Sequence, residues 1–269
     1  MMDEKTEITP IIETDINDQF EKEISLHRVI GNKSAADILK VVVEQYQNDT
    51  LAGRNPQLSP VLLVGQQSRF TMVRALSNTY GNLNFVMVSA YFLTQFVQNI
   101  NDFFSSNSKY STYYISNAEL LNATCQLQLY KILKYKRISI LDPIENTWSQ
   151  VRFQNRLIIL SASKIDTLSR SLLDEIPIQV NLGQYSAAEI FQILKQRVCF
   201  LNWSVSSDEL LSSIAQVSGG EVRKGIELLR MSYFVMRSKG EDEIDEAHLN
   251  KALHLLDENG KAAGQKTVG

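Results

Sequence analysis

The chain has 269 residues, 44% of them hydrophobic and 21% charged, which is typical of a globular protein with one large or two unequal domains. No stretch reaches the roughly 18 apolar residues that cross a bilayer, and the N-terminus lacks the basic and apolar regions of a signal peptide, so we expect a cytoplasmic protein. Cys125 and Cys199 occur singly within helical patterns, which indicates core residues in a reducing compartment and implies neither a disulfide nor a zinc site.

Charge is unevenly distributed along the chain. Residues 1–23 contain eight acidic and two basic side chains, a net charge of −6, whereas the whole chain carries −3. We therefore expect an acidic, solvated tail at 1–23, followed by a body of charge +3. So weak a positive charge does not indicate strong binding to a phosphate backbone.

After the tail, the apolar pattern alternates between helix and strand. A helix is predicted at 32–47, and Gly53, Asn55 and Pro56 break the chain after it. Strands are predicted at 61–64, 85–88, 112–115, 157–160 and 178–182, with helices from Thr71 and at 92–103, 118–134 and 167–173 between them. This alternation predicts a parallel sheet covered by helices on both faces.

Two segments depart from the alternation. Residues 138–151 alternate apolar and polar side chains around two turn signals, which predicts an inserted β-hairpin. From Ser186, which forms a capping box with Glu189, only helices are predicted, at 187–201, 207–217, 221–236 and 246–256. The expected organisation is an α/β domain at 24–183, a small all-helical lid at 184–257 and a frayed tail at 258–269.

The first strand ends in Gly65 and leads through a loop into a helix, the setting in which a P-loop binds phosphates through backbone N–H groups. The pattern GxxxxGK[ST] places its second glycine, lysine and hydroxyl residue at Phe70, Thr71 and Met72. Phe70 would block the backbone's approach to a phosphate, Thr71 lacks the lysine's charge, and Met72 cannot ligate Mg²⁺. Phe70 is also apolar enough to fill the empty site itself.

Several segments occur in the order and at the spacing of one known family. They lie at 27–33, 61–65, 113–117, 157–164, 172–176 and 218–223, the last followed by Leu228-Leu229. This set resembles the RuvB family of AAA+ branch-migration helicases, with its Ile-Gly-Gln opening, Walker A, Walker B, sensor 1, arginine and sensor 2 segments. The resemblance covers about 24–260, includes the hairpin, and stops before the family's C-terminal winged-helix domain. It implies a P-loop NTPase (AAA+) domain followed by the helical lid.

The resemblance also implies which residues would act on ATP. The Walker B acids correspond to Ser116 and Asn117, and the two arginines that end the family's sheet domain correspond to Leu173 and Glu175. What remains for a degenerate ATP site is Gly65, Arg69 as a substitute cation, and Arg223 at the sensor 2 place. We therefore expect no catalytic residue, no metal, and no tight binding of ATP or Mg²⁺.

Two surfaces are candidates for partner binding. The first is a cluster of cations (Lys131, Lys134, Lys136 and Arg137) beside Tyr130 and Tyr135, which would suit nucleic acid or else be a solvated helix end. The second is the hairpin, whose family counterpart docks onto a junction-binding partner protein. Here Trp148, Ile140 and Ile144 would form the contact, unless Trp148 folds back onto the core.

Together these features predict a catalytically inactive, RuvB-like AAA+ protein that acts as a scaffold or regulatory subunit in a DNA-processing or AAA+ assembly. Its expected partner is a protein, either another AAA+ subunit or a junction-binding protein, with weak DNA binding and no membrane. Two alternatives remain open: a residual ATPase that uses Arg69 and Arg223, and a nucleic-acid-binding module that uses the 131–137 cluster.

Overall fold

The computed structural model describes residues 20, 23–54, 60–81, 84–97, 100–142 and 147–265, except for the side chains of 140–142 and 258–265. At its centre is a five-stranded parallel sheet with strand order β2-β3-β6-β1-β7. The strands are β1 (Val61–Val64), β2 (Phe85–Ser89), β3 (Thr112–Ser116), β6 (Leu157–Ala162) and β7 (Ile178–Asn181). The parallel sheet predicted from the sequence is therefore confirmed.

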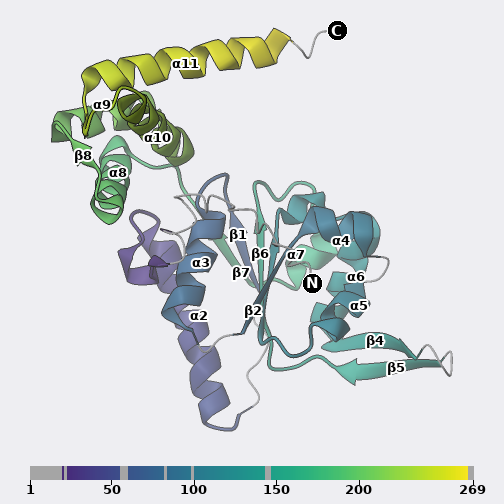
Figure 1. Cartoon of the computed structure of the whole chain (residues 1–269). Helices are drawn as coiled ribbons and strands as arrows, with labels where there is room; N and C mark the ends of the chain where they lie inside the picture. The colour runs from purple at the N-terminus through teal and green to yellow at the C-terminus, as the bar shows by residue number, and fades with distance from the viewer. Residues whose placement is uncertain are drawn as a thin grey trace, which may run out of the picture.

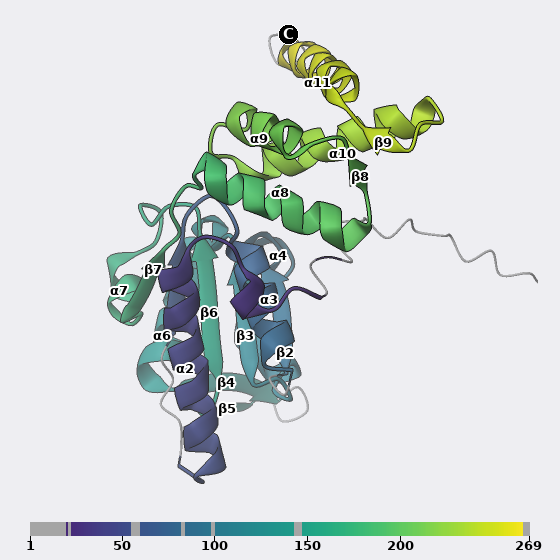
Figure 2. The same ribbon diagram turned by 90° about the vertical axis from the view of Figure 1, so that its left-hand side faces the viewer.

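Helices cover both faces of this sheet (Figures 1 and 2). One face carries α2 (Lys33–Leu51) and α3 (Arg69–Thr79), and the other carries α4 (Ala90–Phe96), α5 (Ile100–Ser106), α6 (Ala123–Tyr135) and α7 (Arg170–Asp174). Strand residues alternate between the two cores: Val61 and Leu63 pack with α2 and α3, whereas Leu62 packs with the opposite layer. Two short 3₁₀ helices, η1 (Leu26–Arg28) and η2 (Ala118–Leu120), precede α2 and α6.

The hairpin consists of β4 (Arg137–Asp142) and β5 (Thr147–Arg152), paired antiparallel. It projects from the sheet domain beside α5 and α6 (Figure 1). Ile138, at its base, is buried in the same core as α5 and α6. The hairpin is thus rooted in the domain while its far end extends away from it.

The lid is a separate helical unit with its own core. It contains α8 (Ala187–Leu201), α9 (Asp208–Val217), α10 (Val222–Ser238) and α11 (Glu246–Gln265), and the expected capping box of Ser186 and Glu189 begins α8. A two-residue parallel pair, β8 (Ser204–Val205) with β9 (Glu243–Ile244), was not predicted, because pairs this short leave no periodic pattern.

Several sequence-based expectations need correction. Phe20 falls in the expected solvated tail, yet it is buried and its ring lies 5.3 Å from that of Phe200 in the lid. Cys199, expected in the core, is exposed. The single helix expected at 92–103 is divided into α4 and α5, and α11 continues to Gln265, past the expected end at 257. Within the described ranges, none of the helices combines the length and the hydropathy that a bilayer crossing requires.

Candidate functional site

The loop between β1 and α3 begins at Gly65, whose backbone requires glycine. Its φ is +154°, and a Cβ there would lie 2.6 Å from the carbonyl oxygen of Leu182. The Gly65 N–H donates to the Ala162 carbonyl at 2.9 Å, so the loop begins held between β6 and the segment after β7. This close backbone approach positions residues 66–68 at the carboxyl edge of the sheet, where parallel α/β folds bind ligands.

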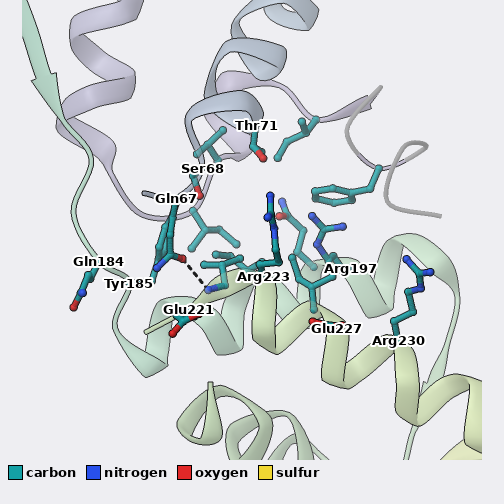
Figure 3. A pocket seen from close by; sticks show the side chains of 18 of the residues that line it. Gln67, Ser68, Thr71, Gln184, Tyr185, Arg197, Glu221, Arg223, Glu227 and Arg230 are labelled. Carbon is teal, nitrogen blue, oxygen red and sulfur yellow. Dashed lines mark hydrogen bonds between the residues drawn. The ribbon is translucent and has the colours of Figure 1, made fainter. Parts of the chain in front are cut away.

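Two side chains of this loop connect it to the linker and the lid. The Tyr185 hydroxyl donates to Ser68 Oγ at 2.7 Å. Gln67 donates from Nε2 to the Gly220 carbonyl at 2.9 Å. Its Oε1 accepts from the Val222 N–H, also at 2.9 Å (Figure 3). Because Val222 begins α10, Gln67 occupies a helix N-terminal N–H that an anionic ligand would otherwise use.

Arg69, the first residue of α3, points toward the end of β3. Its guanidinium Nη2 donates to Asn117 Oδ1 at 3.3 Å, and Nη1 lies 3.6 Å from Glu119 Oε1. The same Glu119 oxygen accepts from the Ser163 N–H at 3.1 Å and from its hydroxyl at 2.7 Å. The Walker A, Walker B and sensor 1 places are therefore joined by a polar network of the protein's own side chains.

Glu119 is a site residue that sequence reasoning missed. It follows the Walker B place by two residues, and its side chain, like that of Arg69, is about 15% exposed. Burial by itself raises the pKa of Glu119, but hydrogen bonds from Ser163 and the backbone, and the Arg69 charge, outweigh burial and lower it. Glu119 is consequently ionised at neutral pH and already paired.

The three residues at the P-loop positions lie in different surroundings. Met72 is fully buried in the core beneath α3, and Thr71 faces the cleft below the lid. Phe70 is 43% exposed, with the Arg74 guanidinium 5.7 Å from its ring centroid. The expectation that Phe70 fills the empty site is therefore wrong, because Phe70 packs on the outer surface of α3.

A cleft of about 770 Å³ separates the sheet domain from the lid. Arg223, which the resemblance assigns to the sensor 2 place, lines it together with Arg197 and Arg230 (Figure 3). Glu221 and Glu227 line the same cleft, and the Arg197 guanidinium lies 4.4 Å over the Phe20 ring. Arg69 makes its polar contacts with Asn117 and Glu119 and is not among the residues that line this cleft. The two arginines proposed for the degenerate ATP site therefore lie in different surroundings.

The hairpin and the basic cluster meet in one groove. Trp148 is 60% exposed, so it does not fold back onto the core, and it lines a groove with Lys131, Lys134 and Arg137. Lys136 is half-buried instead; burial lowers its pKa, and the charge of Glu175 opposes that change. Ile140 pairs with Ser149 in the ladder but its side chain is not described, and Ile144 lies outside the described residues.

One further cluster combines Glu241, Asp245 and His248, whose ligand atoms lie within 4.8 Å of one another. The His248 N–H donates to Asp245 Oδ1 at 3.0 Å, and the Asp245 N–H donates to His248 Nδ1 at 3.1 Å. These reciprocal bonds cap the start of α11, as a capping box does, and leave Nε2 3.0 Å from Glu241 Oε2. His248 is therefore a buried capping residue of the lid.

The comparisons with known proteins concern the fold. No family model matches the sequence, and no curated protein matches it significantly. Among solved structures, the Thermotoga maritima RuvB Holliday junction branch migration motor superposes with a TM-score of 0.68 at 19% identity, over 88% of this chain and 74% of that one. A mutant of the same motor with a proline replaced by glycine gives a TM-score of 0.70 at 18% identity, over 87% of this chain and 73% of that one. A mutant with a lysine replaced by arginine gives a TM-score of 0.69 at 19% identity, over 89% of this chain and 74% of that one. The chain has a RuvB-like AAA+ fold.

Proposed function

We propose that this RuvB-like protein is catalytically silent and acts as a scaffold or regulatory subunit in a DNA-processing or AAA+ assembly. The observation that carries the proposal is the network of Arg69, Asn117, Glu119 and Ser163 at the sheet edge. The two charged groups, Arg69 and Glu119, face each other at 3.6 Å and each also bonds to a polar neighbour, although Arg69 Nη1 and Glu119 Oε2 are buried without a hydrogen-bond partner among the described residues. A nucleotide with its metal would have to break this network before it could bind in the same place.

The remaining groups are too weak to replace the lost chemistry. A helix N-terminus stabilises an anion by about 0.3–1 kcal/mol, at best about 2. Micromolar affinity requires about 8 kcal/mol. Ser116 offers no charge to a metal and Asn117 cannot accept a proton from water, so both the metal site and the general base of the Walker B place are missing.

A DNA-processing assembly is proposed on the fold alone, since the similar solved structures described above are those of a Holliday junction branch migration motor and its mutants. The surface proposed for partner contact is the hairpin, whose exposed Trp148 is anchored to the domain through Ile138.

The cleft supports a second candidate function, metal-independent binding of an anionic nucleotide. Arg197, Arg223 and Arg230 all line this 770 Å³ space, which is large enough for a cofactor-sized ligand. Glu221 and Glu227 on the same lining reduce its net positive charge, and the Gln67 bonds to Gly220 and Val222 hold the loop against the lid. These features favour the scaffold function.

Measuring turnover separates the two functions. The full-length protein should release no phosphate from millimolar ATP above the buffer background, with Mg²⁺, with Mn²⁺ or with EDTA. Turnover that requires Mg²⁺ and is abolished by Arg69→Ala would refute the silent-site proposal. Nucleotide binding that is unchanged by EDTA and abolished by Arg223→Ala, without turnover, would favour the second candidate.

A further inference from the structure

The groove between α6 and the hairpin brings together two features that are separate in the sequence. Its α6 wall carries Lys131, Lys134 and Tyr135, and its hairpin wall carries Arg137 and Trp148. Ser139, Gln150, Gln128 and Asn101 supply uncharged polar groups between them, and the volume is about 820 Å³. Among the described residues that line it, every charged side chain is a cation.

The ladder register explains why this wall of the hairpin is basic. Arg137 pairs with Arg152, Ser139 with Gln150, and Leu141 with Trp148, and residues two apart on a strand share a face. Ile138 and Val151 form the intervening pair and therefore belong to the other face. Trp148 thus shares its face with two arginines and a glutamine, and not with position 140, with which the sequence analysis grouped it.

The Arg137–Arg152 pair places two cations directly opposite each other across the ladder. Like charges directly opposite each other across a ladder are destabilising, and both arginines are exposed. Arg137 donates to the neutral Gln150 Oε1 at 3.3 Å. On α6, Lys134 donates to the Tyr130 hydroxyl at 2.6 Å, and the acidic group whose charge reaches Lys134 is Glu175. Arg137 and Lys134 thus bond to uncharged groups, so these hydrogen bonds do not neutralise their positive charges.

The two exposed rings determine which polyanion fits. Trp148 and Tyr135 are 60% and 61% exposed, and both line the groove. The wall that carries Trp148 is held in place, because Asn101 Oδ1 accepts from the Ser139 N–H at 3.1 Å, which joins β4 to α5. Exposed rings beside a row of cations are the pattern with which proteins bind unpaired bases and the phosphates that link them. A duplex hides the faces of its bases, so these rings would add little to its binding.

We propose that this groove binds single-stranded nucleic acid. Its phosphates lie along Lys131, Lys134 and Arg137 in the groove and continue to Arg152, directly across the ladder from Arg137, and one base stacks on Trp148. The proposal is independent of the silent ATP site, since the groove shares no residue with the network of Arg69 and Glu119. Either proposal can therefore fail without the other.

The test measures binding of a fluorescein-labelled oligothymidylate of about 20 nucleotides to the full chain by anisotropy. With four cations on the phosphates, the logarithm of the affinity should fall with the logarithm of salt concentration at a slope of about −2.8, roughly 50-fold between 50 and 200 mM salt. Trp148→Ala should bind the oligonucleotide about 5- to 150-fold more weakly, because one base loses its stacking partner. Trp148→Phe keeps an aromatic ring and should retain most of the affinity. A duplex of the same length should bind more weakly than the single strand.

Charge variants give the matched control. Lys131→Glu combined with Lys134→Glu should weaken binding and make the salt slope less steep by at least about 1.4. Lys239→Glu combined with Lys251→Glu makes the same change in net charge at exposed lid positions and should leave binding near the wild-type value. Tryptophan fluorescence adds a direct readout. Trp203 lies in the lid, stacked on Tyr233 at 4.1 Å between ring centroids, away from the groove. Quenching of the fluorescence by the oligonucleotide should therefore come from Trp148 and be lost in Trp148→Ala.

Three results would overturn the proposal. One is the absence of binding at 50 mM salt. Another is equal affinity of wild-type protein and Trp148→Ala, with both proteins folded by their melting temperatures. The third is binding of a poly-glutamate peptide, lost in the same variants, without binding of the oligonucleotide, which would assign the groove to an acidic protein partner.

Discussion

The Arg69–Glu119 pair should contribute to folding as an intrinsic part of the protein. Replacing Glu119 by Gln removes the charge but keeps the size and an acceptor for Ser163, and it leaves Arg69 facing a neutral group. Breaking a fully buried ion pair costs about 3–5 kcal/mol, and exposed pairs contribute about 0–1. With both side chains about 15% exposed and 3.6 Å between the charged atoms, we expect Glu119→Gln to cost about 1–3 kcal/mol.

A double-mutant cycle with Arg69→Met isolates the interaction between the two residues. Urea unfolding of the four proteins should give a coupling energy of about 1–2 kcal/mol. The exposed Lys195–Asp208 pair, whose side chains are 45% and 58% exposed, serves as the control and should show a weaker coupling than the Arg69–Glu119 pair, because solvent screens it. A coupling of zero between Arg69 and Glu119, or one that appears only with Mg²⁺ and ATP, would show that the network does not occupy the site by itself.

The other predictions concern single positions. Thr71→Lys should not restore ATP turnover, because catalytic groups act as a unit and those of the Walker B place are still missing; phosphate release above background would contradict this. Gln67→Ala removes two bonds between the loop and the lid and should cost about 1–2 kcal/mol, measured by urea unfolding, while speeding hydrogen exchange at the Val222 amide; unchanged exchange would count against the connection. Trp148→Ala should change the unfolding free energy by less than about 1 kcal/mol, because the ring is 60% exposed; a loss of about 3–5 kcal/mol would make it a core residue. Because the folded-state pKa of Glu119 is lowered, its contribution to stability is complete above about pH 4.3, the ordinary glutamate value, and is lost as pH falls through the lower folded value. Glu119→Gln should therefore lose stability less steeply than the wild type below that pH, and parallel curves would contradict the assignment.

The sheet was predictable because its signal is local. Buried strands such as 61–64 and 157–162 are short apolar runs, and the helices between them have helical periodicity. The P-loop position was found because a strand, Gly65 and a helix follow one another directly in sequence. Within the described residues, the fold class and the order of the elements both followed from such patterns.

The replacement of the ATP site by internal bonds could not be predicted in the same way. Gln67 and Gly220 are 153 residues apart, and Glu119 and Ser163 are 44 apart. Neither pair belongs to a motif, and a glutamine or a glutamate in a loop is ordinarily solvated. Tertiary packing alone brings these side chains together.

The groove lies between these two cases. The cations of α6 and Trp148 were each noticed, but Trp148 was grouped with Ile140 and Ile144 as one contact surface of the hairpin. The face of Trp148 depends on the register of the hairpin, which pairs position 137 with 152. A prediction of that register from the turn residues would have placed the tryptophan among the arginines.

The central claim, a nucleotide site filled by the protein's own bonds, is tested most directly by thermal unfolding of the full chain with and without 5 mM ATP and Mg²⁺. A ligand at 100 times its Kd stabilises a protein by about 2.7 kcal/mol, which would raise the melting temperature of a chain of this size by about 5–10 °C. Inorganic tripolyphosphate at the same concentration controls for anion effects on the arginine-lined cleft. The account predicts the same melting temperature with ATP as with tripolyphosphate, and a rise of 5 °C or more specific to ATP and Mg²⁺ would contradict it.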